Sequence, residues 1–165
     1  MITKPQPALV YLFDWGNTLM LDDSNQSLPM VEWRQVAAMD GALALLKLLS
    51  QSSRIMLATG AATSNETQIR AALDRVDLGQ YIERIYCQAN TGLTKSAAFY
   101  QFILDDLSLP PCAAVMVGDH FDKDILAANA IGIPAIWLNT QTKESRSAPL
   151  HCTIHHLAEL EIAIQ

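Results

Sequence analysis

Residues 8–20 read Ala-Leu-Val-Tyr-Leu-Phe-Asp-Trp-Gly-Asn-Thr-Leu-Met, and the rest of the chain is arranged around them. The apolar run 9–13 stops at Asp14, and a Gly-Asn pair follows. A short apolar run bounded by turn residues is typical of a strand buried on both faces. Ligand sites of open α/β sheets lie outside the carboxyl ends of the strands, so Asp14 is a candidate site residue. The alternative interpretation is an ordinary turn aspartate.

Composition indicates one globular domain over residues 1–165, of which residues 1–7 form a polar lead-in. Half of the residues are hydrophobic, and the formal net charge is −6, which disfavours nonspecific nucleic-acid binding. The three cysteines are far apart, no signal-peptide pattern is present, and no apolar stretch is long enough to span a bilayer. We therefore expect a cytoplasmic protein that binds no membrane.

Apolar strand patterns alternate with helical patterns along the chain, which predicts a doubly wound parallel sheet. The fold class is α/β: a three-layer, Rossmann-like sheet of about five strands, with at most a small flap at residues 19–40. The predicted strands are 9–13, 54–59, 84–87, 112–117 and 133–138. The main predicted helices are 41–50, 63–74, one that starts at Thr94 or Ser96 and is closed by Pro110-Pro111, 122–131 and 156–164.

Local signals add detail to these helices. Asp40 and Asp122 resemble N-caps, and residues 63–66 match a capping box. In the flap, one face of a short helix would carry Val31, Val36 and Met39. In the helix after residue 96, the predicted buried side carries Ala98, Phe102, Leu104 and Leu107.

Polar groups follow three predicted strands, namely Asp14, Thr59 and Asp119, while Lys95 begins a helix and Asp124 follows Asp119. In one sheet these groups could converge. Converging carboxylates repel one another unless a cation lies among them, and Mg²⁺ suits such a site. The lysine and the threonine hydroxyl would then face the oxygens of an anionic substrate.

At this point the sequence resembles the haloacid dehalogenase-like (HAD) superfamily over nearly the whole chain. The resemblance rests on four motifs in order. They read Leu-Phe-Asp14-Trp-Gly16-Asn-Thr18, Ile-Met-Leu-Ala-Thr59-Gly60, Gly-Leu-Thr-Lys95-Ser and Val-Gly118-Asp119-His-Phe-Asp-Lys-Asp124. Any one motif is weak, but four in order on the predicted elements are specific.

The resemblance implies a role for each residue. Asp14 would be the nucleophile that forms an aspartyl-phosphate, and Thr59 and Lys95 would bind the transferring phosphoryl group. Mg²⁺ would be held by Asp14, the backbone carbonyl of Gly16 and Asp119, with Asp124 orienting the site or binding through water.

Gly16 departs from the family pattern, because phosphatases of the family carry at this position an Asp that protonates the leaving group and then activates water. Its loss removes general acid–base help worth about 10²–10⁴-fold in rate. Other residues that could transfer the proton are His120, Asp22 and Asp23, although a loop role and solvated charges explain them as well. Phosphonatase-like chemistry needs a cap lysine, which residues 19–40 lack, and dehalogenases carry a larger cap.

Two functions remain open. One is a Mg²⁺-dependent hydrolase with an impaired or altered acid, acting on a phosphorylated small molecule or macromolecule. The other is a catalytically lapsed binding or regulatory protein. The small flap leaves the site open, so a homo-oligomer could supply the cover.

Overall fold

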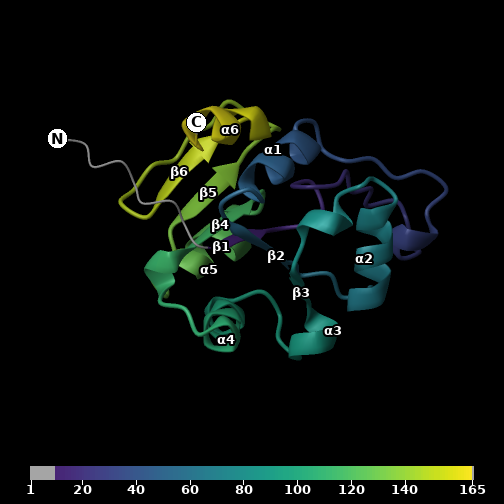
Figure 1. Cartoon of the computed structure of the whole chain (residues 1–165), viewed down its shortest axis with the longest axis horizontal. Coiled ribbons are helices and arrows are strands. Elements are labelled where there is room, and N and C mark those ends of the chain that lie inside the picture. The colour runs from purple at the N-terminus through teal and green to yellow at the C-terminus, as the bar shows by residue number, and fades with distance from the viewer. Residues whose placement is uncertain (1–9, 165) are drawn as a thin grey trace.

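The computed structural model describes residues 10–164, and its centre is a six-stranded sheet in the order β3-β2-β1-β4-β5-β6 (Figure 1). All neighbouring strands are parallel. The predicted lead-in at 1–7 lies outside the described residues, as does residue 9 of the first predicted strand. The strands are β1 (Val10–Phe13), β2 (Arg54–Ala58), β3 (Arg84–Tyr86), β4 (Ala114–Gly118), β5 (Ala135–Leu138) and β6 (His151–Ile154).

Helices cover both faces of the sheet, which confirms the predicted three-layer α/β fold. One face packs against α1 (Ala42–Leu49), α2 (Glu66–Asp74) and α6 (Leu157–Ile164), and the other against α4 (Ala97–Leu107) and α5 (Ala127–Asn129). The short helix α3 (Gln88–Thr91) follows β3. Among the described residues, every helix is too short or too polar to cross a bilayer.

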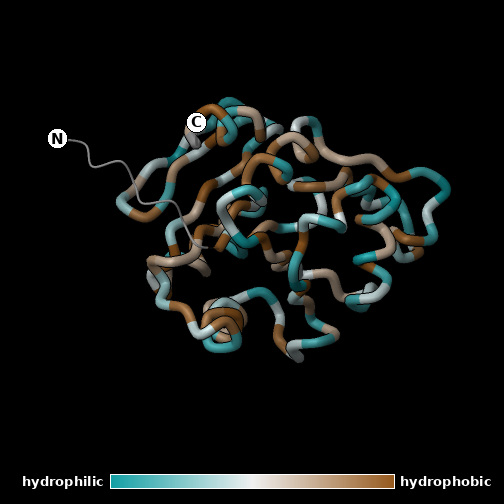
Figure 2. The backbone as a smooth tube through the Cα atoms, in the orientation of Figure 1, coloured by the Kyte–Doolittle hydropathy of each residue, from teal (hydrophilic) through white to brown (hydrophobic). Residues whose placement is uncertain are grey.

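Strand β1 belongs to both hydrophobic cores. Tyr11 and Phe13 point into the core under α1, α2 and α6, while Val10 and Leu12 point into the core under α4. Each of these side chains is buried, as expected for a continuous apolar run in the middle of a parallel sheet. Figure 2 shows hydrophobic and hydrophilic stretches following one another along the backbone.

Strand register brings the polar strand ends together. Phe13 pairs with Leu57 of β2 and with Val117 of β4, so the three strands end at nearly the same level. The backbone N–H of Asp14 continues the ladder by donating to the Val117 carbonyl at 2.9 Å. Side chains that follow these strands therefore meet at one edge of the sheet.

Residues 19–40 lie in the connection between β1 and α1, which is a long loop with one 3₁₀ turn, Met30–Glu32. The short helix predicted to carry Val31, Val36 and Met39 does not form, so that prediction was wrong. The segment is held instead by tertiary contacts. The Arg75 guanidinium, just after α2, donates to the carbonyls of Val31, Trp33 and Arg34 at 2.7–3.2 Å.

The sixth strand, β6, was missed by the sequence prediction. Its residues, His-Cys-Thr-Ile, lack an apolar run, because β6 lies at the edge of the sheet and only Ile154 is buried. It forms because β5 presents an unpaired edge, with which His151–Ile154 pair in register.

Several helix details also differ from the predictions. Helix α4 buries Phe99, Tyr100 and Ile103 with Leu104, whereas Ala98 and Phe102 are exposed. A one-residue shift in phase explains this, since apolar residues occur on both sides of the helix.

The N-terminal caps of three helices also differ from the predicted ones. Asn65 rather than Thr63 caps α2, in a capping box with Gln68. Helix α1 begins after Gly41, whose φ of 80° makes the turn, and no side chain caps it, so Asp40 is not an N-cap. His120 rather than Asp122 caps the π-helical turn Phe121–Leu126.

Candidate active site

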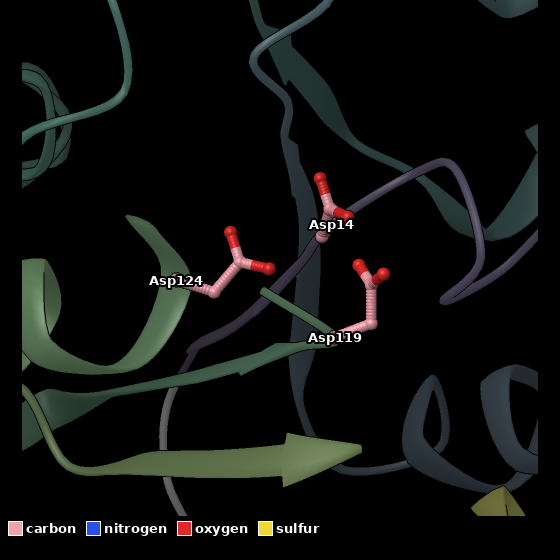
Figure 3. A group of neighbouring side chains, drawn as sticks. All are labelled: Asp14, Asp119 and Asp124. Carbon is pink, nitrogen blue, oxygen red and sulfur yellow. The ribbon is translucent and has the colours of Figure 1, made fainter. Parts of the chain in front are cut away.

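Three carboxylates meet beyond the carboxyl ends of β1 and β4. One oxygen each from Asp14, Asp119 and Asp124 lies within 4.8 Å of the others. Figure 3 shows Asp14 and Asp119 following neighbouring strands and Asp124 approaching from the adjacent helical turn. The sequence prediction that these three residues converge is matched by the structure.

Lys95 lies against this cluster. Its ammonium is 2.7 Å from Asp14 Oδ1 and 2.5 Å from Asp124 Oδ1, and its side chain is only 4% exposed. Lys95 immediately precedes Ser96, whose hydroxyl caps α4 by accepting the Phe99 N–H. The cap fixes the chain at this point and directs the lysine toward the strand ends.

Asp124 is held by a backbone hydrogen bond and by an ion pair. Its Oδ2 accepts the backbone N–H of His120 at 2.9 Å. Its buried Oδ1 is ion-paired with the Lys95 ammonium and has no other polar partner among residues 10–164. The side chain packs directly on Gly118, where a Cβ atom would lie 2.6 Å from the Cβ of Asp124. Glycine at 118 is therefore required for this close approach.

Two further residues orient the cluster, and the sequence analysis gave neither a role. The buried Thr18 hydroxyl lies 3.4 Å from Asp14 Oδ2 and 3.3 Å from Asp119 Oδ1, so it can donate to either. The Trp137 indole of β5 donates to the main-chain carbonyl of Asp119 at 2.9 Å. Thr18 belongs to the quoted motif, whereas nothing in the sequence near Trp137 indicates its contact.

Thr59 and Gly16 face the same open cavity of about 440 Å³ as Asp14, Lys95 and the other two carboxylates. The Thr59 side chain accepts the Ala61 N–H at 3.1 Å, which leaves its hydroxyl proton free for a ligand oxygen. The cavity thus brings together every residue that the sequence predicted for the site.

Negative charge is in excess, since one ammonium faces three carboxylates. Burial raises the pKa of Asp119 to about 7, and the charges of Asp14 and Asp124 add to the shift. Burial and the charge of Asp14 raise the pKa of Asp124 to about 6, against the opposing influence of Lys95. For Lys95, burial lowers the pKa, but the two carboxylates outweigh burial and raise it overall.

This charge balance suits a divalent cation. Without one, the cluster retains protons at pH values where isolated carboxyl groups are ionised. Hard oxygen donors at the mouth of a cavity that also presents an ammonium and a hydroxyl can hold a cation and an anionic group together.

His120, which we considered as an alternative proton donor, lines the cavity and is exposed. Its Nδ1 accepts the backbone N–H of Lys123 at 3.3 Å, so the ring caps the following turn.

Comparison with known proteins points to one family. A sequence model of the HAD-hydrolase-like family matches residues 95–160. A ribulose-1,5-bisphosphate 5-phosphatase from Halopiger xanaduensis is 30% identical over 122 residues, which are 73% of this chain and 49% of that protein. The chain spans about half the length of this curated relative.

Solved structures share the fold. An uncharacterized protein from Listeria monocytogenes serotype 4b superposes with a TM-score of 0.80 at 25% identity, over 94% of this chain and 96% of that one. A HAD-hydrolase from Bacillus subtilis, solved with bound magnesium, gives a TM-score of 0.76 at 14% identity, over 97% of this chain and 100% of that one. Together with the four motifs, these matches show that the chain is similar to haloacid dehalogenase-like hydrolases, and the family model covers its residues 95–160.

Proposed function

We propose that this chain hydrolyses phosphate monoesters, with Asp14 as the nucleophile and Mg²⁺ at the carboxylate cluster. The observation that carries the proposal is the position of Asp14, which ends β1 at the cavity with the Lys95 ammonium 2.7 Å from its Oδ1. The similarity to a ribulose-1,5-bisphosphate 5-phosphatase from Halopiger xanaduensis supports a phosphorylated substrate.

The residues present fit a Mg²⁺ ion. The three carboxylates lie close together, and burial together with the charges of Asp14 and Asp124 raises the pKa of Asp119. Asp14, Asp119 and the Gly16 carbonyl would hold the ion, and Asp124 would support the site. A bound Mg²⁺ supplies positive charge that stabilises the phosphoryl oxygens.

The remaining chemistry belongs to the chain itself. The Asp14 carboxylate attacks phosphorus, so a carboxylate–phosphorus bond forms while the bond to the leaving alcohol breaks. Lys95 and the Thr59 hydroxyl bind the transferring oxygens, and both are already directed into the cavity. Water then releases phosphate and regenerates Asp14.

The open cavity would admit a phosphorylated small molecule or a phosphorylated side chain of a macromolecule. A second copy of the chain covering the site stays a prediction from the sequence, and so does a cytoplasmic location.

The test is turnover of nitrophenyl and alkyl phosphates with and without Mg²⁺. We expect Mg²⁺-dependent release of phosphate, loss of it to the background rate in Asp14→Asn, and a phosphorylated Asp14 in quenched wild-type protein by mass spectrometry. Asp122→Asn is the matched control, because Asp122 is exposed and does not line the cavity.

Gly16 favours one other function, a binding module that retains the cation and phosphate pocket without turnover. Mg²⁺ and phosphate binding by a folded protein that hydrolyses no ester would support that function and contradict the hydrolase.

A further inference from the structure

The side-chain position that Gly16 leaves empty is filled from elsewhere in the chain. A Cβ atom built on Gly16 would lie 3.0 Å from Oδ2, 3.2 Å from Cβ and 3.3 Å from Cγ of Asp22. Asp22 therefore places its carboxylate where a side chain at position 16 would begin. Gly16 is not among the glycines with positive φ, so close approach rather than backbone conformation accounts for the glycine.

Local structure holds Asp22 in this position. Asn17 adopts the left-handed conformation with φ of 57°, and its side-chain oxygen accepts the Asp22 N–H at 3.1 Å. Isolated bridges between Gly16 and Met20 and between Met20 and Ala38 fold the chain back over the end of β1. The Asp22 side chain consequently lines the same cavity as Asp14 and Thr59.

The Asp22 oxygen nearest to Gly16, Oδ2, accepts no hydrogen bond from the described residues. Asp22 Oδ1 accepts the Asp23 N–H at 2.9 Å, whereas Oδ2 has no hydrogen-bond partner among residues 10–164. The other acid of the flap differs, because both oxygens of Asp23 accept hydrogen bonds from Asn25 and Gln26.

We propose that Asp22 is the catalytic residue that transfers the proton in this site, an inference that rests on the hydrolase function proposed above. As Asp14 attacks phosphorus and the ester P–O bond breaks, the leaving oxygen takes the proton of the Asp22 carboxyl group and departs as an alcohol. The Asp22 carboxylate then takes a proton from water while the water oxygen bonds to phosphorus. Phosphate leaves, Asp14 is regenerated, and Asp22 is protonated again.

Other cavity groups are less well placed for this role. Lys95 is committed to Asp14 and Asp124, and His120 uses Nδ1 to cap a turn. Asp22 combines a position over residue 16 with an unpaired oxygen, on a side chain that lines the cavity.

The experiment compares Asp22→Asn with Asp23→Asn, its neighbour on the same flap. Rates are measured on phosphate esters of graded leaving-group pKa, with Mg²⁺-dependent melting as the check of folding. Because an alkoxide is a poor leaving group without a proton, Asp22→Asn should lower turnover of alkyl phosphates by about 10²–10⁴-fold. The first release of nitrophenolate from nitrophenyl phosphate should lose much less, because this leaving group needs no proton, while phosphorylated Asp14 should accumulate because water is no longer activated. Asp23→Asn should behave as the wild type does.

A double variant that moves the carboxyl group from position 22 to position 16 makes the test sharper. In Gly16→Asp/Asp22→Ala the contacts with Oδ2 and Cγ of Asp22 are removed, the 3.2 Å approach to the Cβ of residue 22 remains, and an acid returns to the same space. We expect at least a tenfold recovery over Asp22→Ala on alkyl phosphates. Gly16→Asp alone should gain nothing over the wild type, since its side chain must displace Asp22.

The outcomes separate the two proposals. Absence of wild-type turnover overturns both. If the wild type is active and Asp14→Asn is not, but Asp22→Asn matches Asp23→Asn on every ester, only the role of Asp22 is overturned. An equal loss in the rate of leaving-group release from alkyl and aryl esters, with no accumulation of phosphorylated Asp14, would also overturn it. A selective loss of alkyl phosphate turnover in His120→Ala would identify His120 as the donor instead.

Discussion

The contact between Gly118 and Asp124 makes Gly118→Ala a decisive substitution. The added methyl carbon would lie 2.6 Å from the Asp124 Cβ and closer still to its carboxylate. Asp124 is 1% exposed and is held by the His120 N–H and by Lys95, so it cannot move without losing one of them. Overpacking of this kind costs about 1–3 kcal/mol.

We therefore expect Gly118→Ala to lower the free energy of unfolding by about 2 kcal/mol, or the Tm by about 4–8 °C for a chain of this size. Urea titration and thermal melting measure both quantities. The matched control is Gly60→Ala, in the same cavity, where a Cβ atom would lie 3.7 Å from the Cβ of Lys95, an ordinary contact. Equal stability of the two variants would refute the reasoning.

Two further predictions concern charge and the flap. In the folded chain the pKa of Asp119 is raised from 3.8 to about 7 and that of Asp124 from 3.8 to about 6. Between about pH 4 and pH 7 the folded, cation-free chain therefore binds more protons than the unfolded chain. Its free energy of unfolding should fall as pH rises through this window. The Tm increase caused by Mg²⁺ should accordingly grow from about pH 5 to about pH 8; an equal increase at both pH values would contradict the charge balance. Arg75→Ala should accelerate amide hydrogen exchange in residues 28–36 without changing the Mg²⁺-induced Tm increase. Arg70→Ala should leave the exchange of residues 28–36 unchanged, because Arg70 donates to the carbonyls of Gly79 and Ile82, outside the flap. Equal exchange in the two variants would mean that Arg75 does not hold the flap.

The central strands and the convergence of the candidate site residues could be predicted because each signal is local. The apolar run before Asp14 is buried on both faces in the structure, and its interruption marks the strand end. Thr59 and Asp119 follow strands in the same way, so parallel register alone brings them near Asp14.

What could not be predicted depends on contacts between distant segments. Strand β6 owes its place to the exposed edge of β5 rather than to its own composition. The buried face of α4 is decided by packing and by the Tyr100 hydroxyl, which donates to the Lys123 carbonyl at 3.0 Å. Asp22 reads in the sequence as a solvated charge, and only the fold-back at Asn17 brings it over Gly16.

The central place of β1 also determines when the site can assemble during synthesis. The strand that carries Asp14 is made before both of its neighbours, which pair with it through Arg54 and Ala114. At ribosomal rates of about 5–20 residues per second, roughly 5–20 s separate the emergence of Phe13 from that of Gly118. Both edges of this apolar strand are unpaired until β2 has been made, and the edge that β4 will cover stays unpaired for the whole interval, exposed to nascent chains and chaperones. Mutations that delay β4 should therefore reduce the yield of folded protein more strongly than equally destabilising mutations in β6, which joins the sheet only at its edge.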